Sequence, residues 1–147
     1  MKRIIWVLLA LGVGSLPAWA ALGESVSSVN ADVQAFGGQH VMVAKAGYNL
    51  HQITTRDGSG LNEFVSPAGT VFGVSWKGHS LPDFGQMLGP HLTDLQTGVR
   101  THVIPRRGVT VQNGDFVLIS IGHGRYSQIR AYIPSLIPAN LTPEVVQ

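Results

Sequence analysis

The stretch YNLHQITTRDGSGLNEFVSPAGTVFGVSWK, residues 48–77, decides the fold. It consists of three runs rich in strand-forming residues and two turn sequences, in the order 48–56, DGSG at 57–60, 61–65, PAG at 67–69 and 70–77. Glycine, proline and aspartate favour tight turns, so the stretch predicts a three-stranded meander. In the third run Phe72, Val74 and Trp76 are spaced two apart, which predicts that they share one face, the core side.

A helix is predicted on each side of this meander. Upstream, apolar residues recur three or four positions apart between Ser25 and Phe36, which is the spacing of one helix face. Downstream, an apolar stripe extends from a capping position at Ser80 to Gly98, with Gly89-Pro90 in its middle. Proline inside a helix removes a hydrogen bond and restricts the residue before it, so we expect a kink or two short helices in series there.

Four more strands are predicted in the last third of the chain, at residues 99–104, 109–112, 116–121 and 125–133. Asn113-Gly114 is a strong hairpin signal, because both residues tolerate the positive φ of a type I′ turn. Residues 116–119 are apolar throughout, which predicts a central strand that is covered on both faces. In the last strand Ile129, Ala131 and Ile133 are expected on the inner face, and the proline-rich tail is expected to dock in extended form.

The order of these elements predicts a single α+β domain at residues 21–147. We expect an antiparallel sheet, or sheets, of about seven short strands with two helices, in the order α-βββ-α-ββββ. No repeat or linker divides the chain, and its length suffices to bury one core without covalent staples.

Residues 1–20, MKRIIWVLLALGVGSLPAWA, are predicted to be a secretory signal peptide. Two basic residues precede thirteen uncharged ones, and the small-x-small rule places cleavage between Ala20 and Ala21. The alternative is a retained membrane anchor, but thirteen helical residues span roughly 20 Å, against about 30 Å of hydrocarbon. We therefore expect an exported bacterial protein, periplasmic or secreted, with no membrane span in its mature form.

Charge and cysteine content exclude several classes of protein. Lys2 and Arg3 account for the whole surplus of ten basic over eight acidic residues, so the mature chain is formally neutral. A neutral chain gives no support for binding to nucleic acid or to an anionic membrane surface. The chain has no cysteine, which excludes disulfides, lipid attachment to cysteine and thiolate metal sites.

The six histidines, at 40, 51, 79, 91, 102 and 123, form no HxH, HxxxH or HExxH spacing. Such spacings set two imidazoles on one side of a metal ion, so the sequence predicts no metal site. No glycine-rich phosphate loop occurs either, and no cofactor is predicted. His51 and His102 are expected on strand surfaces and His123 in a turn, although histidines distant in sequence could still converge in the fold.

No catalytic residue is assigned from the sequence, and the chain is not predicted to be an enzyme. Ser66 and Ser127 lack the G-x-S-x-G motif, and Ser66 precedes a proline at a turn, where a hydroxyl serves the backbone. Each acid that could join a hydrolytic pair has a local role: Asp57 as a turn former, Glu63 as a strand surface charge, Asp83 as a charge in the first turn of a helix and Asp94 as a helix surface charge.

One cluster near the last strand suggests a ligand site. Tyr126, Arg130 and Tyr132 share one face of the predicted strand, with Arg125 on the other face. These side chains could bind a sugar or an anionic ligand through stacking and charge-assisted hydrogen bonds. The alternative is an ordinary solvated sheet face.

The segment VSPAGTVFGVSWKGHSLPDFGQMLG, residues 65–89, resembles the signature stretch of DUF2844, a family of uncharacterised exported bacterial proteins. Residues 21–23 and 130–134 also resemble the family's pattern, so the likeness covers nearly the whole mature chain. It implies a small exported domain and supplies no catalytic residues. The layout of a helix followed by strands joined at DGSG and PAG also resembles the PepSY-type module of exported peptidase propeptides and regulators.

These observations predict a non-enzymatic binding or accessory domain whose partner is another envelope or secreted protein. A small envelope hydrolase is one alternative, and it requires a pocket in which a histidine meets a serine or a carboxylate. A PepSY-like regulator or inhibitor is the other. It requires the first helix to pack against the meander and the sheet to leave an edge that accepts a partner strand.

Overall fold

A computed structural model of the chain describes residues 22–100, 108–123 and 125–147. The predicted signal peptide with its cleavage site at Ala20 and Ala21, His102 and most of the predicted strand 99–104 lie outside the described residues. No helix of the described residues has the length and apolar character that crossing a membrane requires.

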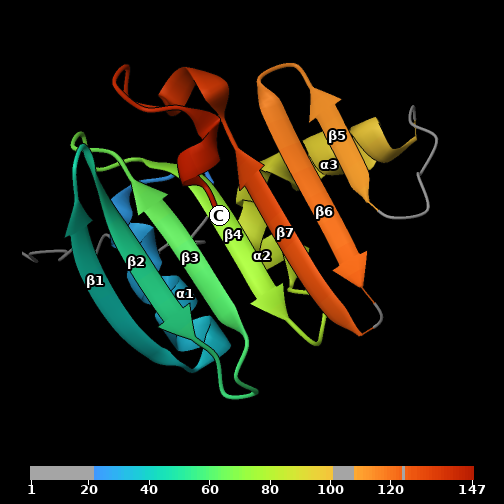
Figure 1. The fold of residues 1–147 in the computed structure, drawn as a ribbon, viewed down its shortest axis with the longest axis horizontal. Helices are drawn as coiled ribbons and strands as arrows, with labels where there is room; N and C mark the ends of the chain where they lie inside the picture. The colour runs from blue at the N-terminus through green and yellow to red at the C-terminus, as the bar shows by residue number, and fades with distance from the viewer. Residues whose placement is uncertain (1–21, 101–107, 124) are drawn as a thin grey trace, which may run out of the picture.

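One open sheet forms the body of the molecule (Figure 1). Its seven strands are β1 (Gln39–Lys45), β2 (Tyr48–Thr54), β3 (Gly60–Val65), β4 (Val71–Gly78), β5 (Val109–Asn113), β6 (Phe116–His123) and β7 (Tyr126–Tyr132). All neighbours are antiparallel, in the order β1-β2-β3-β4-β7-β6-β5. Two meanders, β1–β4 and β5–β7, are therefore joined by the pairing of β4 with β7. The predicted α+β class with seven antiparallel strands is confirmed.

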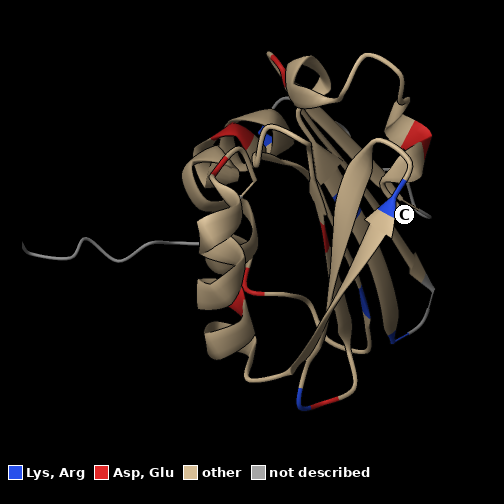
Figure 2. Cartoon of the chain, turned by 90° about the vertical axis from the view of Figure 1, so that its left-hand side faces the viewer, with Lys and Arg blue, Asp and Glu red and all other residues tan. Residues whose placement is uncertain are grey.

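All the α-helices cover one face of this sheet (Figure 2). They are α1 (Val29–Phe36), preceded by the 3-10 turn η1 (Val26–Ser28), and α2 (Phe84–Leu88) and α3 (Leu92–Val99), joined by the turn η2 (Gly89–His91). Of the two arrangements expected at Gly89-Pro90, a kink or two short helices in series, the structure has the second. Asp83, rather than Ser80, caps the first of them, because its carboxylate accepts a hydrogen bond from the Gln86 backbone N–H at 3.1 Å.

The two faces of the sheet carry separate hydrophobic clusters. The larger cluster lies under the helices and includes Trp76, Met87 and Ile129. A smaller cluster lies on the opposite face, where residues 134–147, the C-terminal segment, cross the sheet with turns η3 (Pro134–Leu136) and η4 (Pro143–Val145). Figure 1 shows this segment in red in front of β4 and β7. It covers only part of that face, and the rest is the open face of the sheet.

A β-bulge in β4 determines which side chains reach each cluster. Phe64 pairs with Gly73 while Val65 pairs with Val71, so Phe72 is one extra residue in β4. The extra residue shifts the alternation, and Phe72 joins the smaller cluster while Val74 and Trp76 remain in the larger one. The prediction that all three share one face is therefore wrong for Phe72.

Three further details differ from the sequence-based expectation. β1 was not anticipated, and it forms one edge of the sheet with Val41 and Met42 exposed. Val99 ends α3 rather than starting a strand. β6, expected to be central and covered on both faces, lies next to the edge strand β5, and its Ile121 is 41% exposed on the open face.

Candidate binding surface on the open face of the sheet

The open face carries rows of polar side chains that the strand register places side by side. Directly opposed residues in antiparallel strands point to the same side, and alternate residues point to opposite sides. Since Leu61, Trp76 and Ile129 point into the main core, the residues between them point away from the helices. One row across the sheet is Gln52, Asn62, Ser75, Arg130 and Ile119, and the next contains Lys77, Gln128 and Ile121.

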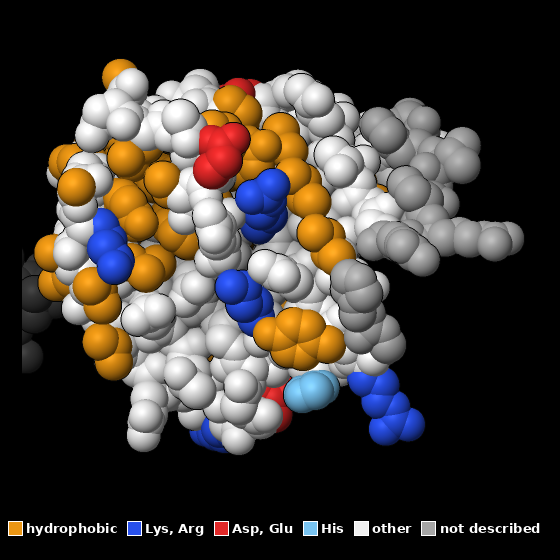
Figure 3. All heavy atoms as spheres, viewed as in Figure 1, with side chains coloured by type: hydrophobic (Ala, Val, Ile, Leu, Met, Phe, Trp, Pro, Cys, Tyr) orange, Lys and Arg blue, Asp and Glu red, His pale blue; other side chains and the backbone are white. Residues whose placement is uncertain are grey.

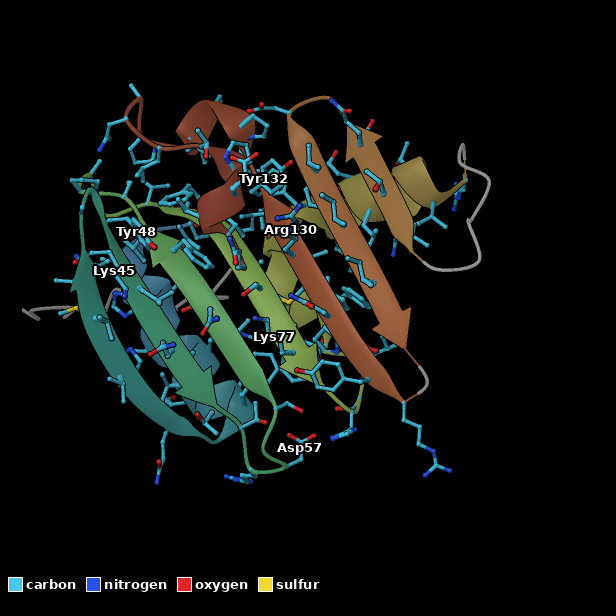
Figure 4. All side chains as sticks on the ribbon, viewed as in Figure 1. Lys45, Tyr48, Asp57, Lys77, Arg130 and Tyr132 are labelled. Carbon is cyan, nitrogen blue, oxygen red and sulfur yellow. The ribbon has the colours of Figure 1, made fainter. Side chains whose placement is uncertain are left out.

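Two basic side chains stand close together in the middle of this face. Lys77 lies opposite Gln128, and Arg130 lies opposite Ser75, so the two cations occupy adjacent rows on the neighbouring strands β4 and β7. Figure 4 labels both, and Figure 3 shows two basic side chains in the middle of the face. Within the described part of the chain the one acid–base contact shorter than 4.0 Å joins His91 and Asp94. Neither Lys77 nor Arg130 is therefore neutralised by a contacting carboxylate.

The acid that approaches this pair of cations belongs to the C-terminal segment. A hydrogen bond from Thr142 and one from its own backbone lower the pKa of Glu144, and the charge of Arg130 lowers it further. Glu144 is exposed and remains beyond ion-pair distance of Arg130. The guanidinium is thus attracted to an acid of the chain itself but keeps its hydrogen-bond donors available to another anion.

A hollow of about 220 Å³ adjoins Arg130 on the open face. One wall is apolar, formed by Ile119 and Ile121 of β6, and the other is polar, formed by Gln128, Arg130 and Gln147. The hollow therefore offers a place for an apolar side chain beside a place for an anion.

The polar row next to this hollow already binds a main-chain oxygen of the C-terminal segment. The Gln147 main-chain oxygen accepts hydrogen bonds from Ser75 Oγ at 2.8 Å and from Asn62 Nδ2 at 3.3 Å. One residue earlier, Val146 is fully buried against Gly73, where a methyl group would lie 2.6 Å from Val146 Cγ2. The face thus holds residues 146–147, which follow the turn η4, through one main-chain oxygen and one apolar side chain.

The three residues predicted to bind a ligand lie on the same face but do different things. Tyr132 lies opposite Gly73 and packs against the smaller cluster, so its ring contributes to the fold. Tyr126 is 43% exposed at the far end of β7, with its ring edge-on to His79 at 5.6 Å. Arg130 lies between them in the polar rows. Of the three, Arg130 has the position that best suits a ligand.

Sequence reasoning did not identify Lys77, Ser75 or Asn62 as part of this surface. Their alternation with Trp76 and Leu61 is visible in the sequence and places them on the outer face of the meander. Their proximity to Arg130 depends on the pairing of β4 with β7, which local sequence patterns do not predict.

A second hollow of about 300 Å³ lies on the helix side, between the end of α1, the β2–β3 turn and residues 80–83. Its acids have structural roles, as predicted for a turn and a helix start. Asp57 accepts hydrogen bonds from Thr55, from the Ser59 backbone N–H at 3.1 Å and from Ser80 Oγ at 3.1 Å, and these bonds lower its pKa to about 2. Asp83 is the cap of α2.

His40, His51, His79 and His91 line neither hollow. His40 Nε2 and His51 Nδ1 are 3.0 Å apart at the sheet edge, and burial followed by the charge of His40 lowers the pKa of His51. His91 Nδ1 lies 2.8 Å from Asp94 Oδ2, whose other oxygen accepts a bond from Asn113, so Asp94 joins α3 to the β5–β6 hairpin. His, Asp and Glu side chains in the described ranges form no group of three that could hold a metal ion.

The serine and carboxylate candidates are placed as follows. Ser66 Oγ accepts a hydrogen bond from the Thr70 backbone N–H at 3.2 Å, which is the turn role expected for it. Ser127 lies in β7 opposite Gly78. Glu63, interpreted from the sequence as a strand surface charge, is instead fully buried under the helices and faces Asp32. The alternation with Leu61 and Val65 contained this information, but a carboxylate is rarely placed in a core.

Comparison with known proteins gives one result. A family model described as "Protein of unknown function (DUF2844)" matches residues 18–146. No curated protein and no solved structure matches the chain. The match covers nearly the whole chain, including every strand and helix described above. The chain belongs to the DUF2844 family.

Proposed function

We propose that this chain is an exported, non-enzymatic binding domain of the bacterial cell envelope that holds an acidic, extended segment of another exported protein on the open face of its sheet. The observation that carries the proposal is the pair Lys77 and Arg130. Two cations without a contacting carboxylate stand on neighbouring strands, in rows whose other polar side chains are uncharged. Such a pair attracts anions and favours carboxylates that reach both strands.

The hydrogen-bond donors around the cations support an extended peptide as the bound form. Ser75 and Asn62 already donate to the main-chain oxygen of Gln147, so the donors of this row are placed to bind a main-chain oxygen. Beyond Gln147 the hollow beside Ile119 continues in line with the same row. A partner segment with alternating apolar and acidic side chains fits both walls of that hollow.

Export is supported by the sequence of residues 1–20, with its basic start, uncharged run and small residues before Ala21. The non-enzymatic assignment is supported by the candidate catalytic groups, which have local structural partners. Asp57 and Asp83 form a turn and a helix cap, and Asp94 is bonded to His91 and Asn113.

The test compares two double variants, each of which removes two positive charges, the first variant from the open face and the second from elsewhere on the surface. Lys77→Gln with Arg130→Gln neutralises the open face, whereas Arg56→Gln with Arg100→Gln neutralises two exposed cations elsewhere. The probe is a short peptide of alternating glutamate and valine, titrated by NMR. We expect the first variant to bind at least about tenfold more weakly than the wild type and the control to bind unchanged. Binding should also weaken as salt increases.

A matched peptide with lysine in place of glutamate is the charge control, and it should bind more weakly than the glutamate peptide. Equal binding of the lysine peptide, or equal loss in the two double variants, would contradict the proposal. A photo-crosslinking residue at Gln128, with one at Gln34 on exposed α1 as the control, then identifies the partner in cells. We expect a specific exported protein to be captured from position 128 alone.

Strand addition at β1 is a second candidate, and one observation favours it. β1 is an edge strand with Val41 57% and Met42 54% exposed, and α1 packs against β2. These are the features required of a PepSY-like regulator that pairs with a partner strand. Capture from a photo-crosslinking residue at Met42, and none from Gln128, would favour this candidate over the open face.

A further inference from the structure

Two carboxyl groups meet in the main core between α1 and the sheet. Glu63 of β3 is 0% exposed, because it alternates with Leu61 and Val65 on the side that the helices cover. Asp32 of α1 is 1% exposed. Together they account for a quarter of the eight acidic residues of the chain, and they are placed where charge is least tolerated.

The hydrogen bonds around this pair are incomplete unless the two groups bond to each other. Gln86 of α2 donates from Nε2 to Asp32 Oδ1 at 2.6 Å. Asp32 Oδ2 and both oxygens of Glu63 have no other donor among the described residues. Two ionised carboxylates have no proton to share and repel each other in a low-dielectric core. A single proton on Glu63 removes the repulsion and supplies the missing donor to Asp32.

The electrostatics of the site place that proton on Glu63. Burial first, then the hydrogen bond to Asp32 and its charge, raise the pKa of Glu63 well above its ordinary value. Burial also raises the pKa of Asp32, but the bonds from Glu63 and Gln86 work in the opposite direction. Asp32 is therefore the acceptor of two hydrogen bonds, and Glu63 is the acid that donates one of them.

Among the residues on the strands and helices that pack around the pair, no cation replaces the proton. On β2, His51 is directly opposite Glu63, and its pKa is lowered by burial and by the charge of His40 on β1, so its neutral form is favoured. On β4 the opposed residue is Val74. Within α1 and α2 the other residues are not titratable, and Asp83 at the start of α2 is exposed.

We propose that Asp32, Glu63 and Gln86 form a proton-dependent latch that ties α1 and α2 to the sheet. The latch is closed while Asp32 and Glu63 share one proton, and it opens when alkaline medium removes that proton. It is separate from the open face of the sheet, since it lies on the opposite side of β3. An exported chain would meet the pH of its surroundings directly, and the latch would make its helical layer sensitive to that pH.

The direction of the pH dependence follows from which state holds more protons. Glu63 keeps its proton in the folded chain at pH values where it has lost it in the unfolded chain. Stability is therefore fully present below the ordinary glutamate range and is lost as pH rises toward the raised pKa of Glu63. The loss corresponds to at most about a tenfold rise in the unfolding constant per pH unit for one proton.

Glu63→Gln is the decisive variant. The amide donates to Asp32 as the protonated acid does, but it has no proton to lose. In denaturant unfolding between about pH 5 and about pH 9, the unfolding constant should rise more steeply with pH in the wild type than in E63Q. The lowered pKa of His51 acts in the opposite direction and equally in both proteins. An unchanged slope in E63Q overturns the proposal.

A matched control separates the latch from acids in general. Asp57→Asn changes a fully exposed acid whose pKa is lowered rather than raised, so it should leave the alkaline slope of the wild type intact. If D57N removes that slope, the dependence does not come from Asp32 and Glu63.

Two further measurements test the proposal. The first needs only the wild-type protein, and the second distinguishes a latch from simple destabilisation. Carbon-detected NMR of the wild-type carboxyl groups should show Glu63 titrating well above the ordinary glutamate range, and titration within that range overturns the proposal. Amide exchange at alkaline pH should lose protection first in α1 and α2, before β6 and β7, and E63Q should abolish this difference. Simultaneous loss everywhere in the wild type would show that there is no latch.

Discussion

Because Gly73 has no side chain, the C-terminal segment can lie directly on the sheet at this position. The bulge turns Phe72 toward the same side, and Val146 fills the space between the two residues and Phe64. A residue near the end of the chain is therefore as deeply buried as any residue of the main core.

Val146→Ala should lower the free energy of unfolding by about 2 kcal/mol, since it removes two buried methyl groups and leaves a small cavity. Val41→Ala is the matched control, because Val41 is 57% exposed and should change stability by less than about 0.5 kcal/mol. Denaturant unfolding of both variants measures the difference. Equal effects would mean that the C-terminal segment is not docked in solution.

Individual residues show where sequence reasoning succeeds and where it fails. The alternation in the last strand correctly places Ile129 and Ala131 in the core. The same alternation fails at Phe72, because a bulge inserts one residue and no residue type announces it. At Glu63 the alternation indicated the core and the residue type suggested the surface, and the structure follows the alternation.

At the scale of elements, α3 approaches β5 closely at Gly98. A methyl group on Gly98 would lie 2.2 Å from Val111 Cγ1, and Val111 is fully buried and stiff at its first side-chain torsion. The glycine lies near the end of α3, where alanine would otherwise favour the helix.

Gly98→Ala should therefore destabilise the chain by about 1 to 2 kcal/mol, despite a gain in helix propensity of up to about 1 kcal/mol. Thr97→Ala, at an exposed position of the same helix, should have little effect. In a Val111→Ala background the substitution at Gly98 should become neutral or stabilising, as measured by a double-mutant cycle. Additive effects of the two substitutions would exclude the predicted clash.

Turn residues made several elements predictable from the sequence, but not all of them. Gly89-Pro90 divides the second helix into two, and a hairpin joins β5 to β6 where Asn113-Gly114 predicted one. Its two turn residues are Gly114 and Asp115 rather than Asn113 and Gly114, and only Gly114 takes a positive φ, so the turn is not the expected type I′.

β1 was missed although Gly37-Gly38 precede it and Gly47 takes a positive φ in the turn after it, because its apolar residues 41–44 are consecutive and show no strand alternation. The apolar run of β6 was a partly correct signal, since Phe116, Val117 and Leu118 are buried, but Ile119 and Ile121 line the hollow on the open face.

At the scale of the whole molecule, the C-terminal segment is the cover of the smaller hydrophobic cluster. Removing residues 134–147 should expose Phe64, Phe72 and Tyr132 together, and we expect weaker cooperativity in thermal unfolding and binding of a hydrophobic dye. Val146→Ala, which keeps the cover in place, should not bind the dye. Cooperative unfolding of the shortened chain without dye binding would show that the segment is dispensable.

The binding surface is likewise a property of the whole molecule. Arg130 was identified from the sequence, because it alternates with core residues in one strand. Its neighbours Lys77 and Ser75 could not be joined to it, because β4 and β7 are distant in sequence. Local patterns predict strands and their faces, whereas strand order, and with it the composition of any surface across strands, depends on long-range pairing.

The central pairing of β4 with β7 also determines the order in which parts of the chain can fold. Synthesis supplies the β1–β4 meander first, and local hairpins form quickly, but the long-range partner of β4 arrives only when β7 has been made. Until then β4 presents an unpaired edge, a template on which another unfinished chain can pair. Residues 134–147, which follow β7 in the sequence, then cover the face that the two meanders create together. We therefore expect the fold to stay incomplete until residues 134–147 have been made, and the joining of its two meanders to be the slowest and most aggregation-prone stage.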